Sequence, residues 1–239
     1  GYQAGYVLST GDYNTAIGWQ ALSSITDSNQ NTAVGYRAGL SLITGAYSNT
    51  IMGFDAMYTA TGSSFANVVV GDRAAAGAGD FDYTVAIGNM ALNELRGTND
   101  TGDYNIAIGG QAGRQQSSGS ANVFIGYQSG YAAGARNYNT AVGHKTLTAI
   151  TTGANNVALG YQAGLALTTG AYNVAIGYQA GEALTVAASN TFIGARAGID
   201  IDGGENNVAI GRDTLYTATT AGSNVIIGAN AGQTIAAGQ

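Results

Sequence analysis

The chain has 239 residues, with 8 Lys and Arg against 14 Asp and Glu and a formal net charge of −6. This balance excludes a basic nucleic-acid-binding surface, and no apolar run approaches the roughly 18 residues that a membrane-spanning helix needs. Cysteine is absent, which excludes a disulfide framework, and proline is absent, which suits strands in which every backbone N–H donates.

One short motif recurs along the whole chain. It reads Asn-Thr-Ala-Val-Gly-Tyr-Arg-Ala-Gly at 31–39 and returns, slightly changed, at 156–164 and 173–181. Positions are counted here from its central glycine, the reference glycine, which occurs at Gly1, Gly18, Gly35, Gly53, Gly71, Gly88, Gly109, Gly126, Gly143, Gly160, Gly177, Gly194, Gly211 and Gly228. Ten of the thirteen intervals are 17 residues, two are 18 and one is 21. A fixed short period predicts a solenoid, in which each copy is one coil stabilised by its neighbours.

The residues directly before each reference glycine predict a strand. From 15–17 to 225–227 they are mostly Val, Ile, Thr and Ala, and the glycine that follows allows a bend. The segment after the glycine is expected to form a second, weaker strand. The predicted fold is therefore all-β: a parallel β-solenoid, or β-roll, of about 14 coils with 17-residue repeats. It forms one repetitive domain over 1–239 and a segment of a longer fibre.

Asparagine marks the fourth position before the reference glycine. It occupies this position in twelve of thirteen coils, and Thr84 is the exception. Identical amides stacked from coil to coil can bond to one another. The row therefore predicts an amide ladder.

Both faces of the predicted strand are apolar. Alternation puts the third and first residues before the glycine on one face and the second residue, usually Ala, on the other. Strands that are apolar on both faces are usually covered on both. We expect one face to fill the roll and the Ala face to pack against two further copies in an intertwined or side-by-side homotrimer. The alternative is a monomeric three-sided solenoid that encloses all these residues. The predicted trimer interface is formed by Ala16, Ala33, Ala107, Phe124, Ala141, Ala158, Ala175, Phe192 and Ala209.

The sequence offers little support for catalysis, and we predict that the chain is not an enzyme. Its only histidine, His144, occupies a position where other coils carry Tyr, and no cysteine can serve as a nucleophile. The acidic residues Asp200, Asp202 and Glu205 share one turn, but solvated turn residues explain them better than a cation site. No metal or other cofactor is predicted.

Aromatic residues recur directly after the reference glycine, several of them followed by Gln. Tyr offers an apolar ring and a polar hydroxyl, which suits sugar binding. The candidate glycan-binding residues are Tyr36, Tyr127, Gln128, Tyr161, Gln162, Tyr178 and Gln179. The alternative is that these rings stack from coil to coil and only shield the roll.

The motif Asn-x-Ala-Ile-Gly-x-x-Ala, seen at 173–180, resembles the head repeats of YadA-like trimeric autotransporter adhesins and the β-roll repeats of phage tail fibres. The resemblance implies a left-handed parallel β-roll of three chains packed through their inner strands. The family repeat is shorter, so the outer turns are expected to be longer here. It also implies a structural and adhesive role in an extracellular fibre, on a cell surface or a virion. The expected partners are the chain itself and a cell-surface glycan or protein receptor, with neither nucleic acid nor membrane insertion.

Two other functions are compatible with a solenoid. Thr at the third position before the glycine, in five coils, suggests a monomeric ice-binding surface, although Val or Ile replaces it elsewhere. A polysaccharide-degrading tailspike would need paired carboxylates across a groove, and the sequence shows no such pair.

Overall fold

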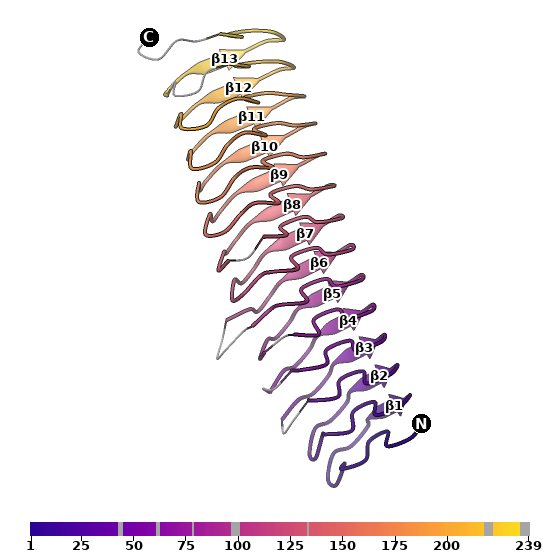
Figure 1. Cartoon of the computed structure of the whole chain (residues 1–239). Coiled ribbons are helices and arrows are strands. Elements are labelled where there is room, and N and C mark those ends of the chain that lie inside the picture. The colour runs from indigo at the N-terminus through magenta and orange to yellow at the C-terminus, as the bar shows by residue number, and fades with distance from the viewer. Residues whose placement is uncertain are drawn as a thin grey trace. The chain divides into compact units, whose positions relative to one another are not determined.

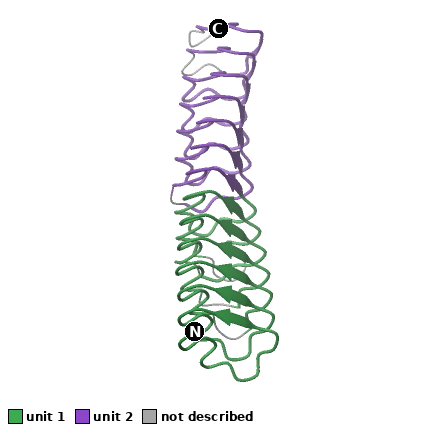
Figure 2. Cartoon of the chain, turned by 90° about the vertical axis from the view of Figure 1, so that its right-hand side faces the viewer, with its two compact units in different colours: residues 1–122 green, residues 123–239 purple. Residues whose placement is uncertain are grey.

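The structure is a computed structural model that describes residues 1–42, 45–60, 63–77, 79–96, 101–132, 134–217 and 222–234. The chain divides into two compact units, unit 1 with residues 1–122 and unit 2 with residues 123–239, which Figure 2 draws in green and purple. Each unit is described by itself. Over the described ranges all regular structure is β, and no helix there is long and apolar enough to cross a membrane.

Each coil contributes one strand of three residues, labelled in Figure 1. The strands of unit 1 are β1 (Thr15–Ile17), β2 (Thr32–Val34), β3 (Thr50–Met52), β4 (Val68–Val70), β5 (Val85–Ile87) and β6 (Ile106–Ile108). The strands of unit 2 are β7 (Val123–Ile125), β8 (Thr140–Val142), β9 (Val157–Leu159), β10 (Val174–Ile176), β11 (Thr191–Ile193), β12 (Val208–Ile210) and β13 (Val225–Ile227). Within each unit every strand pairs in parallel with the next strand in the chain.

The pairing confirms the predicted parallel β-solenoid. Equivalent positions of successive coils lie opposite each other, as in Val174 with Thr191 and Ile176 with Ile193. The expectation of a second, weaker strand in each coil is wrong, because the segment after the reference glycine forms turns. The second and fourth residues after that glycine have left-handed backbone, for example Gln179 with φ 54° and Gly181 with φ 58°. A chain that bends twice within four residues cannot continue as a strand.

Several left-handed corners are occupied by residues with side chains. Leu147 has φ 46° and Tyr172 has φ 60°, and such a conformation costs a non-glycine residue about 1–2 kcal/mol. Hydrogen bonds to the neighbouring coil offset this cost. The N–H groups of Gln179 and Tyr172 donate to the carbonyls of Tyr161 and Ala154 at 2.9 and 3.1 Å. The corners are therefore held by stacking between coils.

The reference glycine is required by both its conformation and its surroundings. Gly177 has φ +135°, and a Cβ added there would lie 2.5 Å from the carbonyl oxygen of Gly194 in the next coil. Successive coils thus touch backbone to backbone at this corner.

The interior of each roll is filled by the central strand residue and by residues from the following turns. The central residue is buried from β2 to β12 and half-buried in β1 and β13. A Cβ on Gly130 would lie 2.5 Å from the ring of Phe124, and a Cβ on Gly198 would lie 2.7 Å from Phe192. The central strand residue and the fourth residue after the reference glycine therefore share one interior space.

The asparagine row forms the predicted ladder. Asn173 Oδ1 accepts hydrogen bonds from the backbone N–H of Asn190 at 3.0 Å and from its side-chain amide at 3.2 Å. The side-chain amide of Asn173 donates to Asn156 Oδ1 and to the Ala187 carbonyl. Thr84 continues the ladder with its hydroxyl, which accepts from the N–H of Asn105 at 3.2 Å. Both polar atoms of the Asn173 amide therefore have partners while being removed from water.

We expect Asn173→Ala to lower the free energy of unfolding by about 2–5 kcal/mol, because the Asn190 N–H and the Ala187 carbonyl lose their partners inside the roll. Asn173→Thr should cost clearly less, since Thr84 shows that a hydroxyl can accept the next N–H. Denaturant unfolding followed by circular dichroism measures both. Equal losses for the two variants would contradict the ladder as the stabilising element.

We expect Gly177→Ala to unfold the surrounding coils, because Cβ would clash with the Gly194 carbonyl as well as strain the backbone. Gly228→Ala is the matched control: Gly228 has φ +128°, but the nearest atom to an added Cβ is 3.7 Å away. Thermal melting should therefore show a much larger loss for Gly177→Ala. Comparable losses would show that the backbone contact between coils is unimportant.

Candidate functional site

The outward side of the strands carries Val, Ile, Leu, Met or Thr side chains in every coil. We call it the strand face and define it as the first and third residues before each reference glycine. These residues are half-buried or exposed in every strand, whereas the central residue points inward. In unit 1 the strand face consists of Thr15, Ile17, Thr32, Val34, Thr50, Met52, Val68, Val70, Val85, Ile87, Ile106 and Ile108. In unit 2 it consists of Val123, Ile125, Thr140, Val142, Val157, Leu159, Val174, Ile176, Thr191, Ile193, Val208, Ile210, Val225 and Ile227.

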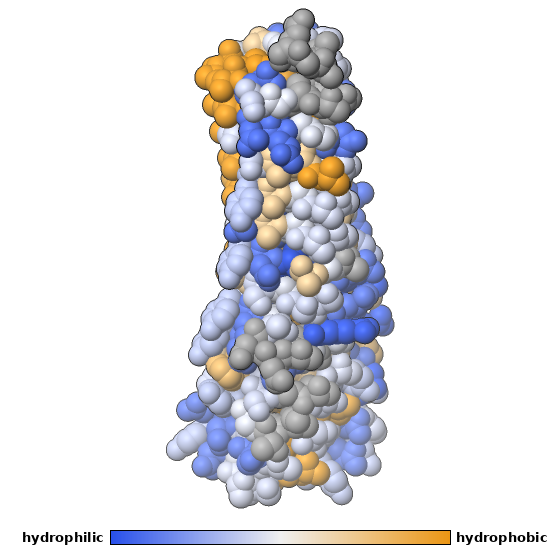
Figure 3. Space-filling model, turned by 90° about the vertical axis from the view of Figure 1, so that its left-hand side faces the viewer, coloured by the Kyte–Doolittle hydropathy of each residue, from blue (hydrophilic) through white to orange (hydrophobic). Residues whose placement is uncertain are grey.

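The strand face carries no charge. None of the chain's Lys, Arg, Asp or Glu residues occupies any of the five positions before a reference glycine, in any coil from Gly18 to Gly228. Most of the exposed large apolar residues, by contrast, lie at these positions or directly after the glycine. The face drawn in Figure 3 is mostly hydrophilic or neutral, with hydrophobic atoms in scattered places and along one edge. Apolar exposure is thus concentrated on particular surfaces.

The structure corrects the predicted interface. Ala33, Ala158 and Phe192 are fully buried within a single chain, and Ala16, in the first strand, is half-buried. The same inward position is taken by the other residues assigned to the interface, namely Ala107, Phe124, Ala141, Ala175 and Ala209. Alternation correctly predicted which residues share a face. The face that was predicted to contact partner chains, however, lies inside the roll. Where the inward residue is large, the turn residue that shares the interior is small, as in Phe124 with Gly130 and Phe192 with Gly198.

Aromatic rings stack along the row that follows the reference glycine. In unit 2, Tyr127 and His144 have ring centroids 5.5 Å apart, His144 and Tyr161 5.2 Å, and Tyr161 and Tyr178 5.3 Å. In unit 1, Tyr36 stacks on Phe54 at 5.1 Å. The expectation that rings stack from coil to coil is confirmed. His144 is exposed as one member of this stack.

Stacking limits how the candidate glycan-binding residues could bind a sugar. A ring between two stacked neighbours, such as Tyr161, presents only its edge and hydroxyl to solvent. Tyr178 ends its stack, since the next residue of the row is Ala195. The neighbouring Gln179 donates from Nε2 to Gln162 Oε1 at 3.3 Å.

The remaining candidates are separated in the structure. Tyr127 and Gln128 lie at the other end of this stack, two coils from Tyr161, and Tyr36 lies in unit 1. The candidate glycan residues of unit 2 therefore form a strip of ring edges and amides, with Tyr127 and Tyr178 at the two ends of the stack.

Two arginine–aspartate pairs connect successive coils. Arg37 donates from Nε and Nη2 to the two carboxylate oxygens of Asp55, each at 2.7 Å. In unit 2, Arg196 Nε lies 2.7 Å from Asp213 Oδ1. The hydrogen bond to the aspartate raises the pKa of each arginine above its usual value. The sequence alone did not predict that these residues would pair.

One arginine is buried inside unit 2. Arg136 is fully buried and lies over the ring of Phe124, 5.1 Å from its centroid. Its guanidinium donates to the backbone carbonyls of Gly130, Ala132 and Ile150. Burial lowers the pKa of Arg136 to about 9, so the group keeps its charge at neutral pH. Backbone carbonyl dipoles therefore stabilise this buried charge.

Within the ranges that the structure describes, no three His, Cys, Asp or Glu side chains lie close enough together to hold an ion.

The chain was compared with known proteins at three levels. No family model matches it, and neither a curated protein nor a solved structure does.

Proposed function

We propose that this chain is a structural and adhesive segment of an extracellular homotrimeric fibre, on a virion or a bacterial surface, that attaches to a cell. The observation that carries the proposal is the strand face: a regular, uncharged, apolar sheet surface that repeats in every coil of both units. The repeat motif's resemblance to adhesin heads and phage fibres supports the extracellular setting and the number of chains.

The regular repetition of the strand face favours covering by another copy of the chain. Six or seven strands spaced about 4.8 Å apart, each three residues long, make roughly 300 Å² of flat sheet per unit. A patch of this size is comparable to the largest contiguous apolar patch on a typical monomeric protein, which is often functional. Because the same surface recurs on every copy, a symmetric assembly can cover it without a second kind of chain. Ile and Val side chains from neighbouring copies would then pack between rows.

Trimerisation would also support attachment. Three copies present three sets of the same ring edges, amides and turns, so weak contacts with a cell surface would add through multivalency. The uncharged strand face would be buried in the assembly. The charged residues lie at other positions of the repeat and would remain in solvent.

We expect native mass spectrometry to give the wild-type protein the mass of three chains. The double variant Val157→Lys/Val174→Lys should have the mass of one chain. Both valines are outward and half-buried, so Lys can remain solvated in the monomer but not against a second apolar sheet. The matched control is Thr152→Lys with Thr169→Lys, at exposed turn positions of the same coils, which should stay trimeric.

Circular dichroism accompanies this comparison, to show that each variant keeps its fold. A monomeric wild type, or a folded Val157 and Val174 variant that keeps three chain masses, would contradict the proposal. Lysine at Ala158 or Ala175 would not test it, because these residues lie inside the roll.

The strand face also favours a second candidate, an ice-binding surface. Thr15, Thr32 and Thr50 lie in register on the outward side of β1, β2 and β3. Ice binding would require this surface to be bare, whereas the assembly covers it. We therefore expect the wild-type protein to show no thermal hysteresis in freezing measurements. Hysteresis that is lost in Thr32→Lys and kept in the control variant of the turns would instead support ice binding.

A further inference from the structure

A polar arrangement of four side chains occurs once in each unit at equivalent positions. It consists of Arg at the second position after one reference glycine and Asp at the second position of the next coil, with Tyr and Thr at that coil's fifth and sixth positions. Module 1 is Arg37, Asp55, Tyr58 and Thr59, and module 2 is Arg196, Asp213, Tyr216 and Thr217. The threonine hydroxyl in both donates to a carbonyl of the following coil at 2.7 Å, that of Ala76 in module 1 and Gln233 in module 2.

Module 1 is closed upon itself. Arg37 binds both oxygens of Asp55, and its remaining nitrogen, Nη1, lies 3.4 Å from the hydroxyl of Tyr58. Its guanidinium carbon lies 4.4 Å from the centroid of the Tyr58 ring. The following coil contributes Ala76 and Gly77, which have no polar side-chain atoms. All three guanidinium nitrogens therefore have protein partners.

Module 2 is open. Nε of Arg196 lies 2.7 Å from one carboxylate oxygen of Asp213, and the second carboxylate oxygen lies 3.3 Å from Nε of Arg212. The Arg196 guanidinium lies further from its tyrosine, 5.7 Å from the Tyr216 centroid, and its side chain is 43% exposed, compared with 28% for Arg37. Within the described part of the chain, Nη1 and Nη2 of Arg196 have no hydrogen-bond partner. Two donors of a fixed, planar cation are thus available.

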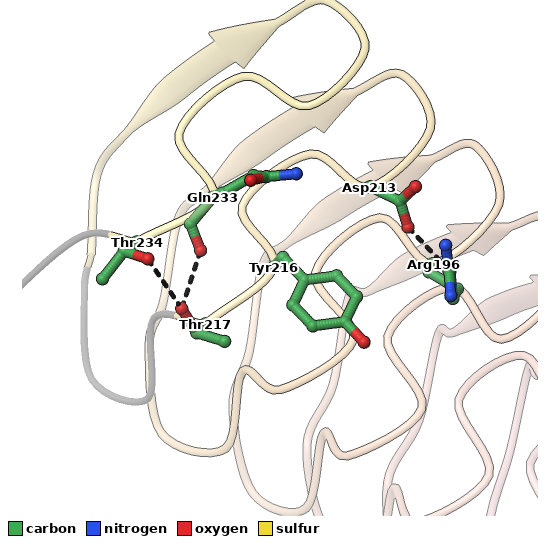
Figure 4. A pocket seen from close by; sticks show the side chains of 6 residues that line it. All are labelled: Arg196, Asp213, Tyr216, Thr217, Gln233 and Thr234. Atoms are coloured by element: carbon green, nitrogen blue, oxygen red, sulfur yellow. Dashed lines mark hydrogen bonds and ion pairs between the residues drawn. The ribbon is translucent and has the colours of Figure 1, made fainter.

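These donors border a pocket of about 290 Å³, lined by Arg196, Asp213, Tyr216, Thr217, Gln233 and Thr234. Figure 4 shows the Tyr216 ring between the Arg196–Asp213 pair and the group formed by Thr217, Gln233 and Thr234. Where module 1 has Ala76 and Gly77, module 2 has an amide and a hydroxyl. Gln233 donates from Nε2 to Asn230 Oδ1 at 3.2 Å, which leaves its Oε1 as an acceptor.

We propose that module 2 binds a single acidic sugar residue, a pyranose that carries a carboxylate. The carboxylate would accept hydrogen bonds from Nη1 and Nη2 of Arg196, the planar arrangement that guanidinium groups favour. The sugar ring would pack on Tyr216, and its hydroxyl groups would meet Gln233 and Thr234. The pocket lies at the small end of ligand sites, which suits one ring.

Charge favours an anion at this position. Arg196 and Arg212 both face Asp213, which leaves a local charge of one positive unit in a chain whose net charge is −6. All six lining residues come from unit 2 of one chain. Binding at module 2 therefore requires neither the proposed trimer nor the strip of stacked tyrosines.

The test is an NMR titration of the full-length chain with D-glucuronate, alongside D-glucose and acetate. We expect saturable shift changes at Tyr216 and Thr217 with glucuronate, and at least about tenfold weaker binding of the two other probes, since each lacks either the charge or the ring. Binding of acetate as tight as that of glucuronate would overturn the role of the ring. Equal binding of glucose would overturn the role of the charge.

Matched variants assign the site. Arg196→Gln should weaken glucuronate binding about tenfold or more, whereas Arg37→Gln, in the closed module, should leave it unchanged. Tyr216→Ala should also weaken glucuronate binding. Because this variant keeps the Arg196–Asp213 pair, weaker binding could not be caused by a broken ion pair alone. No saturable shift in the wild type, or equal loss in the two arginine variants, would overturn the proposal.

Discussion

Exact registration of one coil on the next is the constraint on which each unit depends. An amide of the ladder, such as Asn173, bonds to the coil before and the coil after, and the reference glycine beside it touches the next backbone. Left-handed corners with side chains, which would be costly in isolation, are held by hydrogen bonds to the preceding or the following coil. A shift of one residue between coils would place asparagine among apolar groups and strand residues on the wrong side. Parallel strands, stacked rings and ion pairs are all consequences of this alignment.

The repeat made much of the fold predictable. The period gave the parallel strands and the asparagine ladder, because a row of identical residues has few other uses in a stack. Alternation separated the two faces but could not say which one was inside. One sequence signal could have decided it: the coils with Phe124 and Phe192 have Gly130 and Gly198 in the following turn. Leu appears at that turn position only where the central strand residue is Ala, as in Leu147 with Ala141. Two positions at which a large residue at one accompanies a small residue at the other pack in the same interior space.

Other features depend on contacts between residues distant in the repeat. Arg136 occupies a position that is otherwise Gly, Ala or Ser, except at Phe81. In the sequences of these two coils, Ala133 and Ala78 stand where many coils have Leu or Ile; both alanines lie outside the described residues. The difference between the closed and open modules could not be predicted, because it rests on distances of a few ångströms around the same residue types.

Variation in coil length has a separate consequence. The ten residues from the fifth before a reference glycine to the fourth after it form a span without insertions, and the additional residues of the 18- and 21-residue coils lie in the sequence between one such span and the next. The constant span contains the ladder, the strand and its corners. An architecture of this kind separates what it displays from what holds it together. The turns can vary in length and sequence, one coil at a time, while the ladder, the strand and its corners stay the same.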